Sequence, residues 1–174
     1  MPSADKYSAK ETLRDGAWVE IRALAPDDRA GLVAAVARTS AESMRRRFFG
    51  PKRSFSNQET AFFLNADFVN HVALVAVVEE RGRPFIAGGG RYIITRPGEA
   101  EVALAVVDEY QGRGVGGALM RHITAIARDA GLEKFVAEVL TENLPMLRLF
   151  EKSGLRMSTK RESGIVHVGL LLSG

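Results

Sequence analysis

The segment GRGVGG, residues 112–117, has the spacing G-x-G-x-x-G that is common where proteins bind phosphate groups. Glycines leave backbone N–H groups uncovered, and a helix that begins at this segment would add the positive end of its dipole. Arg113 adds a full positive charge beside these amides. The segment therefore favours an anionic ligand, and a pyrophosphate would fit.

Two common phosphate-binding folds do not match the surroundings of this segment. A dinucleotide-binding fold needs its first glycine directly after a strand, but Asp108 to Gln111 separate Gly112 from the strand before it. A P-loop needs Gly-Lys followed by Ser or Thr, and this sequence is absent. The residues alone leave a purely structural alternative open, in which the glycines only let a helix pack close to a sheet.

The elements that must position this segment predict one α+β domain. Alternating apolar residues predict strands, and apolar residues at i, i+3, i+4 and i+7 predict helices. The expected strands are 18–24, 71–80, 85–95, 100–107, 134–139 and a hairpin around Ser163-Gly164, and the expected helices are 26–39, 41–49, 58–65, 115–130 and 143–154. Residues 1–17 resemble a flexible lead-in. We therefore expect a single domain over 18–174, with a mixed, mostly antiparallel sheet of about six to seven strands and flanking helices.

Glycines 88–90 lie inside the expected strand 85–95. Glycine in a strand interior often marks a β-bulge or the close approach of another backbone. We expect one of these two features at this point of the sheet.

Composition limits the classes of protein that the chain could be. Its 174 residues suit one domain, and the absence of cysteine excludes disulfides and thiolate chemistry. A net charge of +3 is too weak to argue for nucleic acid, and the longest apolar run, Val72–Val78, is too short to cross a membrane. The first residues lack the apolar core of a signal peptide, so a cytoplasmic location is the default expectation. The three histidines show no ligand spacing, and we expect no metal site.

Two motifs resemble the GNAT superfamily of acyl-CoA N-acyltransferases. Residues 111–116, QGRGVG, resemble its Q/R-x-x-G-x-G/A signature, and residues 143–155, NLPMLRLFEKSGL, resemble its N-x-x-x-x-x-L-Y-x-K-x-G-F segment. The similarity covers roughly residues 18–172. Segments 40–50, 100–107 and 136–148 further resemble the acetyltransferase domain of Pat-type bacterial protein lysine acetyltransferases.

This resemblance implies a site for acetyl-CoA. The backbone amides of the glycine motif would hold the pyrophosphate, and the pantetheine arm would pair with the edge of the strand before it. Asn143 would hydrogen-bond the pantetheine, cap the helix that follows, or do both. The expected coenzyme-binding residues are Leu104, Ala105, Val106, Val107, Gln111, Gly112, Arg113, Gly114, Val115, Gly116 and Asn143.

The resemblance also implies acetyl transfer to a primary amine, which must first lose a proton because a lysine has a pKa near 10.4. Glu101, a carboxylate within an apolar strand, is the expected general base, acting through water. Its alternative role is a rim carboxylate paired with an arginine, and Glu99 is the second candidate for the base. The amine would attack the thioester directly in a ternary complex, and a backbone N–H near Val106 or Val107 would stabilise the oxyanion.

Phe150 departs from the family pattern, because many members have a tyrosine there that protonates the leaving thiolate. Solvent or another group would replace it, unless the step needs no acid. We expect Tyr92 and Tyr110 to be packing residues rather than this acid.

The acceptor is the least determined part of the prediction. We expect a protein lysine, with an acyl-CoA synthetase as the first substrate to test by resemblance. A small amine (a polyamine, amino acid or aminoglycoside) is the alternative, and a non-catalytic acetyl-CoA sensor is a third. The basic run 45–47 would be a solvated helix face or a surface for an acidic partner. A homodimer is expected from the family alone, since no stretch specifies an interface.

Overall fold

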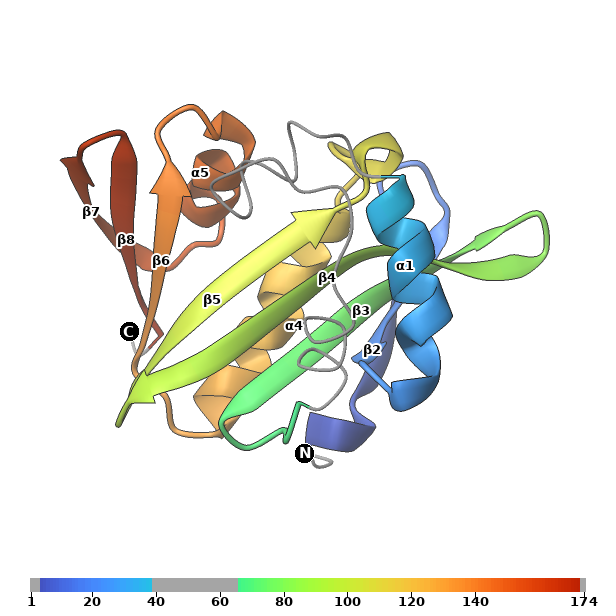
Figure 1. The fold of residues 1–174 in the computed structure, drawn as a ribbon, viewed down its shortest axis with the longest axis horizontal. Coiled ribbons are helices and arrows are strands. Elements are labelled where there is room, and N and C mark those ends of the chain that lie inside the picture. The colour runs from blue at the N-terminus through green and yellow to red at the C-terminus, as the bar shows by residue number, and fades with distance from the viewer. Residues whose placement is uncertain (1–3, 39–65, 173–174) are drawn as a thin grey trace.

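Eight strands form one mixed sheet in the order β1-β2-β3-β4-β5-β6-β8-β7 within the described part of the chain, residues 4–38 and 66–172 of a computed structural model (Figure 1). The strands are β1 (Ser8–Thr12), β2 (Trp18–Ala23), β3 (His71–Glu80), β4 (Arg83–Arg96), β5 (Glu99–Val106), β6 (Lys134–Leu140), β7 (Arg156–Glu162) and β8 (Ile165–Leu171). The helices are α1 (Arg29–Ala37), α4 (Val115–Asp129) and α5 (Leu144–Glu151), with 3-10 turns η1 (Ala4–Lys6), η2 (Pro26–Asp28) and η3 (Asp108–Tyr110). The α+β class, with its mostly antiparallel sheet, is confirmed.

Among the strands of the described residues only β5 and β6 run parallel, and they pair over a short stretch. Their register joins Glu99 to Lys134, Ala100 to Phe135 and Glu101 to Val136. Beyond Glu101 the two strands separate, and Figure 1 shows them diverging towards α5. The sheet therefore forks along one edge of β5.

The two faces of the sheet are covered unequally. Helix α4 lies against one face, where its apolar stripe is buried with the core, and α1 lies over the other (Figure 1). Along β5 the side chains of Val102 and Leu104 are buried on the α4 face. Because side chains alternate along a strand, Glu101 and Ala103 project to the α1 face.

The glycines of β4 serve both of the purposes expected of them. The register between β3 and β4 shifts after the pair Ala76–Gly88, so that Val77 pairs with Ile86 and Ala87 is the extra residue of a bulge. A Cβ at Gly88 would lie 2.8 Å from the backbone carbonyl oxygen of Ala105 on β5, so the missing side chain lets the two strands approach this closely. The bulge and the tight contact both lie opposite the end of β5.

The N-terminal segment differs from its prediction. Residues 8–12 are not a loose lead-in but the edge strand β1, which pairs antiparallel with β2 from Ser8–Arg22 to Thr12–Trp18. This strand brings the sheet to eight strands rather than six or seven. No residue of β1 is fully buried, and its sequence has no alternating apolar pattern. Its extended conformation is explained by its pairing with β2.

The other predicted elements lie within a few residues of the observed ones. Asn143 caps α5 instead of beginning it, and the last hairpin turns at Ser163 and Gly164, both with positive φ. The expected helices 41–49 and 58–65 and the basic run 45–47 lie outside the described residues. No helix in the described ranges is long and apolar enough to cross a membrane.

Candidate active site

The fork between β5 and β6 leaves one edge of β5 without a neighbouring strand. Val107 N donates to Ala87 O of β4 at 2.8 Å. Because backbone groups alternate in direction along an antiparallel ladder, the N–H and C=O groups of Val102, Leu104 and Val106 point the other way, towards the fork. This edge is suited to an extended ligand that carries amides.

A cavity of about 1010 Å³ runs along this edge. Its walls come from β5, the turn before α4, one face of α4, and α5. Of the twelve predicted site residues, ten line it: Glu101, Leu104, Ala105, Val106, Val107, Gln111, Gly112, Gly114, Gly116 and Asn143. Residues from β5, the glycine turn, the start of α4 and the loop before α5 therefore line one cavity.

The glycine turn ends at the N-terminus of α4. Gly114 is the N-cap with φ of 100°, a left-handed conformation that disfavours any residue with a Cβ. The first helical hydrogen bond is Ala118 N to Gly114 O at 3.0 Å. The N–H groups of Val115, Gly116 and Gly117 therefore have no acceptor within the helix, and they can bind an anion.

Arg113 and Val115 do not line the cavity, and their side chains have other roles. Arg113 Nε donates to Asp15 Oδ2 at 3.1 Å, and its guanidinium carbon lies 4.6 Å from the centroid of the Tyr110 ring. Val115 is fully buried in the core. Both residues can therefore serve a phosphate through their backbone amides, but the Arg113 side chain, whose charge was expected beside these amides, is engaged with Asp15 instead.

Gln111 and Asn143 hold opposite ends of the site by side-chain hydrogen bonds. Gln111 Nε2 donates to Val106 O at 3.1 Å, on the open edge of β5. Asn143 Oδ1 accepts from Met146 N at 3.3 Å, so the capping role expected for it is present. Asn143 is buried and lines the cavity as well, and the two expected roles are compatible.

Glu101 is the last residue of β5 that pairs with β6, so its carboxylate lies at the base of the fork. It borders the large cavity and a second cavity of about 460 Å³ on its other side. Glu99, the second candidate, is paired with Arg96 at 3.2 Å. Among the described residues Glu99 therefore fills the rim-carboxylate role through Arg96, while Glu101 forms no salt bridge within 4 Å.

Arg91 lies on the same face of the sheet as Glu101, two positions along β4 from Ile93, the residue that pairs with Glu101. Burial lowers the pKa of the Arg91 guanidinium, and the negative charge of Glu101 acts in the opposite direction. The base of the fork therefore carries a carboxylate facing a partly desolvated guanidinium.

Neither tyrosine replaces the missing acid at Phe150. Tyr92 is buried, and its burial raises its pKa to about 12. Tyr110 lines the cavity, but its hydroxyl donates to Glu80, and burial followed by that hydrogen bond raises its pKa to about 12. Phe150 itself is 1% exposed and belongs to the hydrophobic core.

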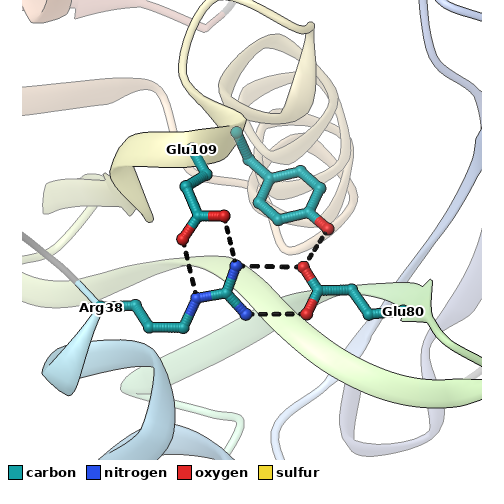
Figure 2. Close-up of polar contacts among 4 residues, drawn as sticks. Arg38, Glu80 and Glu109 are labelled. Atoms are coloured by element: carbon teal, nitrogen blue, oxygen red, sulfur yellow. Dashed lines mark hydrogen bonds and ion pairs between the residues drawn. The ribbon is translucent and has the colours of Figure 1, made fainter.

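A network behind the glycine turn was not predicted. Figure 2 shows Arg38, at the end of α1, bound to Glu80 at 2.7 and 3.1 Å and to Glu109 at 2.7 and 3.0 Å. Tyr110, whose hydroxyl meets the same Glu80, directly precedes Gln111. The network thus holds η3, which directly precedes the glycine turn. Its members lie far apart in sequence, and no local pattern signals them.

The N-terminal segment also contributes unpredicted residues to the site. Glu11 to Arg14 line the cavity beside α4. Glu11 accepts hydrogen bonds from Arg121 and His122, and although burial would raise its pKa, these two partners lower it. Because β1 carries no apolar pattern, no local sequence feature predicts that this segment lies against the site.

Comparison with known proteins identifies one family. The model of the acetyltransferase (GNAT) family matches residues 39–155. The acetyltransferase Pat of Mycolicibacterium smegmatis is 31% identical over 146 residues, which are 82% of this chain and 42% of the relative. An acetyltransferase of Pseudomonas aeruginosa is 33% identical over 125 residues, 71% of this chain and 67% of the relative.

The solved structure of the GNAT domain of S. lividans PAT is similar over nearly its whole length. Its TM-score is 0.86 and its identity 35%, with 94% of this chain and 96% of that chain covered. The present chain thus spans one domain of that kind and less than half the length of the mycobacterial relative.

Proposed function

Because the chain belongs to the GNAT family and is an acetyl-CoA-dependent acetyltransferase, we propose that it acetylates lysine side chains of proteins with Glu101 as general base. The observation that carries the proposal is the position of Glu101 at the base of the fork, between the coenzyme-side cavity and a second cavity. The resemblance to Pat-type proteins supports the choice of lysine as acceptor. The two segments of that resemblance that lie wholly in the described residues form β5 and the end of β6 with the start of α5.

The coenzyme would bind with its pyrophosphate at the glycine turn and its pantetheine along the open edge of β5. The amides of Val115 to Gly117 and the dipole of α4 favour the pyrophosphate charge. The backbone groups of Leu104 and Val106 are oriented to pair with the amides of the pantetheine arm. The thioester would then lie along β5, nearer to Glu101.

Acetyl transfer follows from this arrangement. The acceptor amine gives up a proton to Glu101 through a water molecule, and its nitrogen forms a bond to the thioester carbonyl carbon. The C–S bond then breaks, coenzyme A leaves as its thiolate, the new amide nitrogen releases its second proton to solvent, and solvent returns a proton to the sulfur. The chain has no cysteine, so no cysteinyl acyl-enzyme can form and the attack is direct.

The hydrogen bonds of the sheet limit which backbone N–H group can stabilise the oxyanion. The N–H of Val107 is bonded to Ala87 O at 2.8 Å and is not free to stabilise a developing charge. The N–H groups of Leu104 and Val106 face the fork. Leu104 lies three residues from Glu101, roughly 10 Å along the strand, which leaves room for the thioester and one water between them.

The test is release of free coenzyme A thiol from acetyl-CoA, with an acyl-CoA synthetase, a basic histone-like protein, a polyamine and an aminoglycoside as separate acceptors. Since the enzyme contributes no thiol, its own background is zero. Release with a protein acceptor, together with acetyl-lysine detected by mass spectrometry, is the expected result. Thiol release with small amines alone would show that the acceptor is a small molecule and not a protein lysine. Tight acetyl-CoA binding without any thiol release would indicate a non-catalytic sensor.

A further inference from the structure

The glycine motif carries its own cation, Arg113, but that side chain is already engaged. It donates to Asp15 and stacks on Tyr110. Asp15 also accepts a hydrogen bond from Ala17 N at 2.9 Å, and this bond and the Arg113 contact lower its pKa. Arg113 is thus committed to holding another loop and does not reach into the cavity.

The loop it holds is the tight turn between β1 and β2. Leu13 and Ala17 close this turn through Leu13 N to Ala17 O at 2.6 Å, and Gly16 N donates to Leu13 O at 3.0 Å. The Asp15–Arg113 pair docks the turn onto the start of α4. The docking brings in Arg14, whose Cγ lies 3.9 Å from where a Cβ at Gly114 would stand.

Arg14 is an exposed side chain on the wall of the cavity. Among the described residues it makes no ion pair, in contrast to its neighbours Arg113 and Arg121, which are held by Asp15 and Glu11. A cation next to the positive end of a helix dipole is electrostatically unfavourable unless an anion lies between them. Arg14 therefore has both the charge and the position to bind an anion at the glycine turn.

We propose that Arg14 binds the pyrophosphate of the coenzyme, and that Asp15 and Arg113 position it to do so. This rests on the proposed function and assigns a new contact within the same site. Arg14 acts across the turn from the backbone amides, so the pyrophosphate lies between a side-chain cation and the N-terminus of α4. Arg113 contributes by fixing the β1–β2 turn.

The experiment measures dissociation constants by isothermal titration calorimetry for coenzyme A, dephospho-coenzyme A and pantetheine. The variants are Arg14→Gln, Arg14→Lys and the control Arg161→Gln, which removes an equally exposed arginine on β7 away from the cavity. We expect Arg14→Gln to weaken coenzyme A by about tenfold, as for one charge-assisted hydrogen bond. Arg14→Lys should recover part of the loss, and Arg161→Gln should match the wild type.

The ligand series separates the possible phosphates. The loss in Arg14→Gln should persist with dephospho-coenzyme A, which lacks the 3′-phosphate, and vanish with pantetheine, which has no phosphate. Loss confined to coenzyme A would move Arg14 to the 3′-phosphate and overturn the assignment, as would equal affinities of Arg14→Gln and wild type. Wild-type protein that binds none of the three ligands would instead refute the proposed function itself. Unchanged melting temperatures show that the variants are folded.

Discussion

Replacing Glu101 by Gln removes the proposed proton acceptor and keeps the size of the side chain. At pH 7.5 a lysine with a pKa of 10.4 is neutral in roughly one molecule in a thousand. A positioned base contributes about 10²–10⁴ to the rate. Because the variant must wait for an amine that is already neutral, we expect kcat to fall about 100- to 1000-fold.

The same variant should leave coenzyme binding almost unchanged. Glu101 and Val106 are five residues apart on β5, roughly 17 Å at the rise of a strand, and the glycine turn lies beyond Val106. The KM for acetyl-CoA should therefore stay within about twofold of the wild type. The kcat deficit should also shrink by about tenfold for each unit of pH between 7 and 9, since the neutral amine becomes more abundant.

The assay is thiol release under saturating acetyl-CoA, with the best acceptor of the panel and a pH series. Glu99→Gln is the matched control, because Glu99 lies on the same face two residues away and is paired with Arg96. Its kcat should stay within about threefold of the wild type. A Glu101→Gln enzyme that keeps more than a third of its kcat, or whose KM for acetyl-CoA rises in proportion to the loss, would show that Glu101 is not the base.

Three further perturbations test other parts of the structure. Gly114→Ala forces a Cβ into a φ of 100°, which costs about 1–2 kcal/mol; the KM for acetyl-CoA should rise about tenfold, and an unchanged KM would contradict the role of the turn. Arg38→Gln breaks the bonds to Glu80, so the KM for acetyl-CoA should rise about threefold while kcat at saturating acetyl-CoA stays unchanged. A loss of kcat without a change in KM would contradict the role of this network in holding the glycine turn. Burial alone would raise the pKa of Asp28, but Arg22 and the Ala25 amide lower it, so its stabilisation is present above the unfolded pKa and lost as pH falls through the folded one. Melting curves should show that Asp28→Asn lowers the free energy of unfolding by about 1–2 kcal/mol at pH 7 and by less near pH 3. An equal loss of unfolding free energy at both pH values would refute the ion pair as the cause of the destabilisation.

The parts of the site that follow from the sequence are those encoded locally. The glycine spacing and the apolar stripe of α4 together predict a helix whose N-terminus is free to bind an anion, and the φ of Gly114 agrees with this. Glycines 88–90 likewise predict the bulge and the close approach of β5, since a Cβ at Gly88 would lie 2.8 Å from the backbone carbonyl oxygen of Ala105. In both places a single residue type carries the constraint.

The parts that do not follow are contacts between residues distant in sequence. Arg38 meets partners 42 and 71 positions away, and Asp15 meets Arg113 across 98 positions. Each partner is an ordinary surface charge when its own neighbourhood is considered. Only the register of β1 with β2, set by backbone hydrogen bonds rather than by an apolar pattern, brings the N-terminal turn to α4.

The missing tyrosine at Phe150 need not weaken catalysis. A tyrosine with a pKa of about 12, as at Tyr110, would have to protonate a thiolate whose conjugate acid has a pKa near 8.5. That transfer is uphill by roughly 5 kcal/mol at 1.36 kcal/mol per pKa unit, so such a tyrosine would be a poor proton donor to this thiolate. The thiolate is already a stable leaving group, whereas the attacking lysine holds its proton tightly. The demand for proton transfer therefore falls on the amine, which is why the carboxylate of Glu101, and not an acid near Phe150, is the group on which the rate should depend.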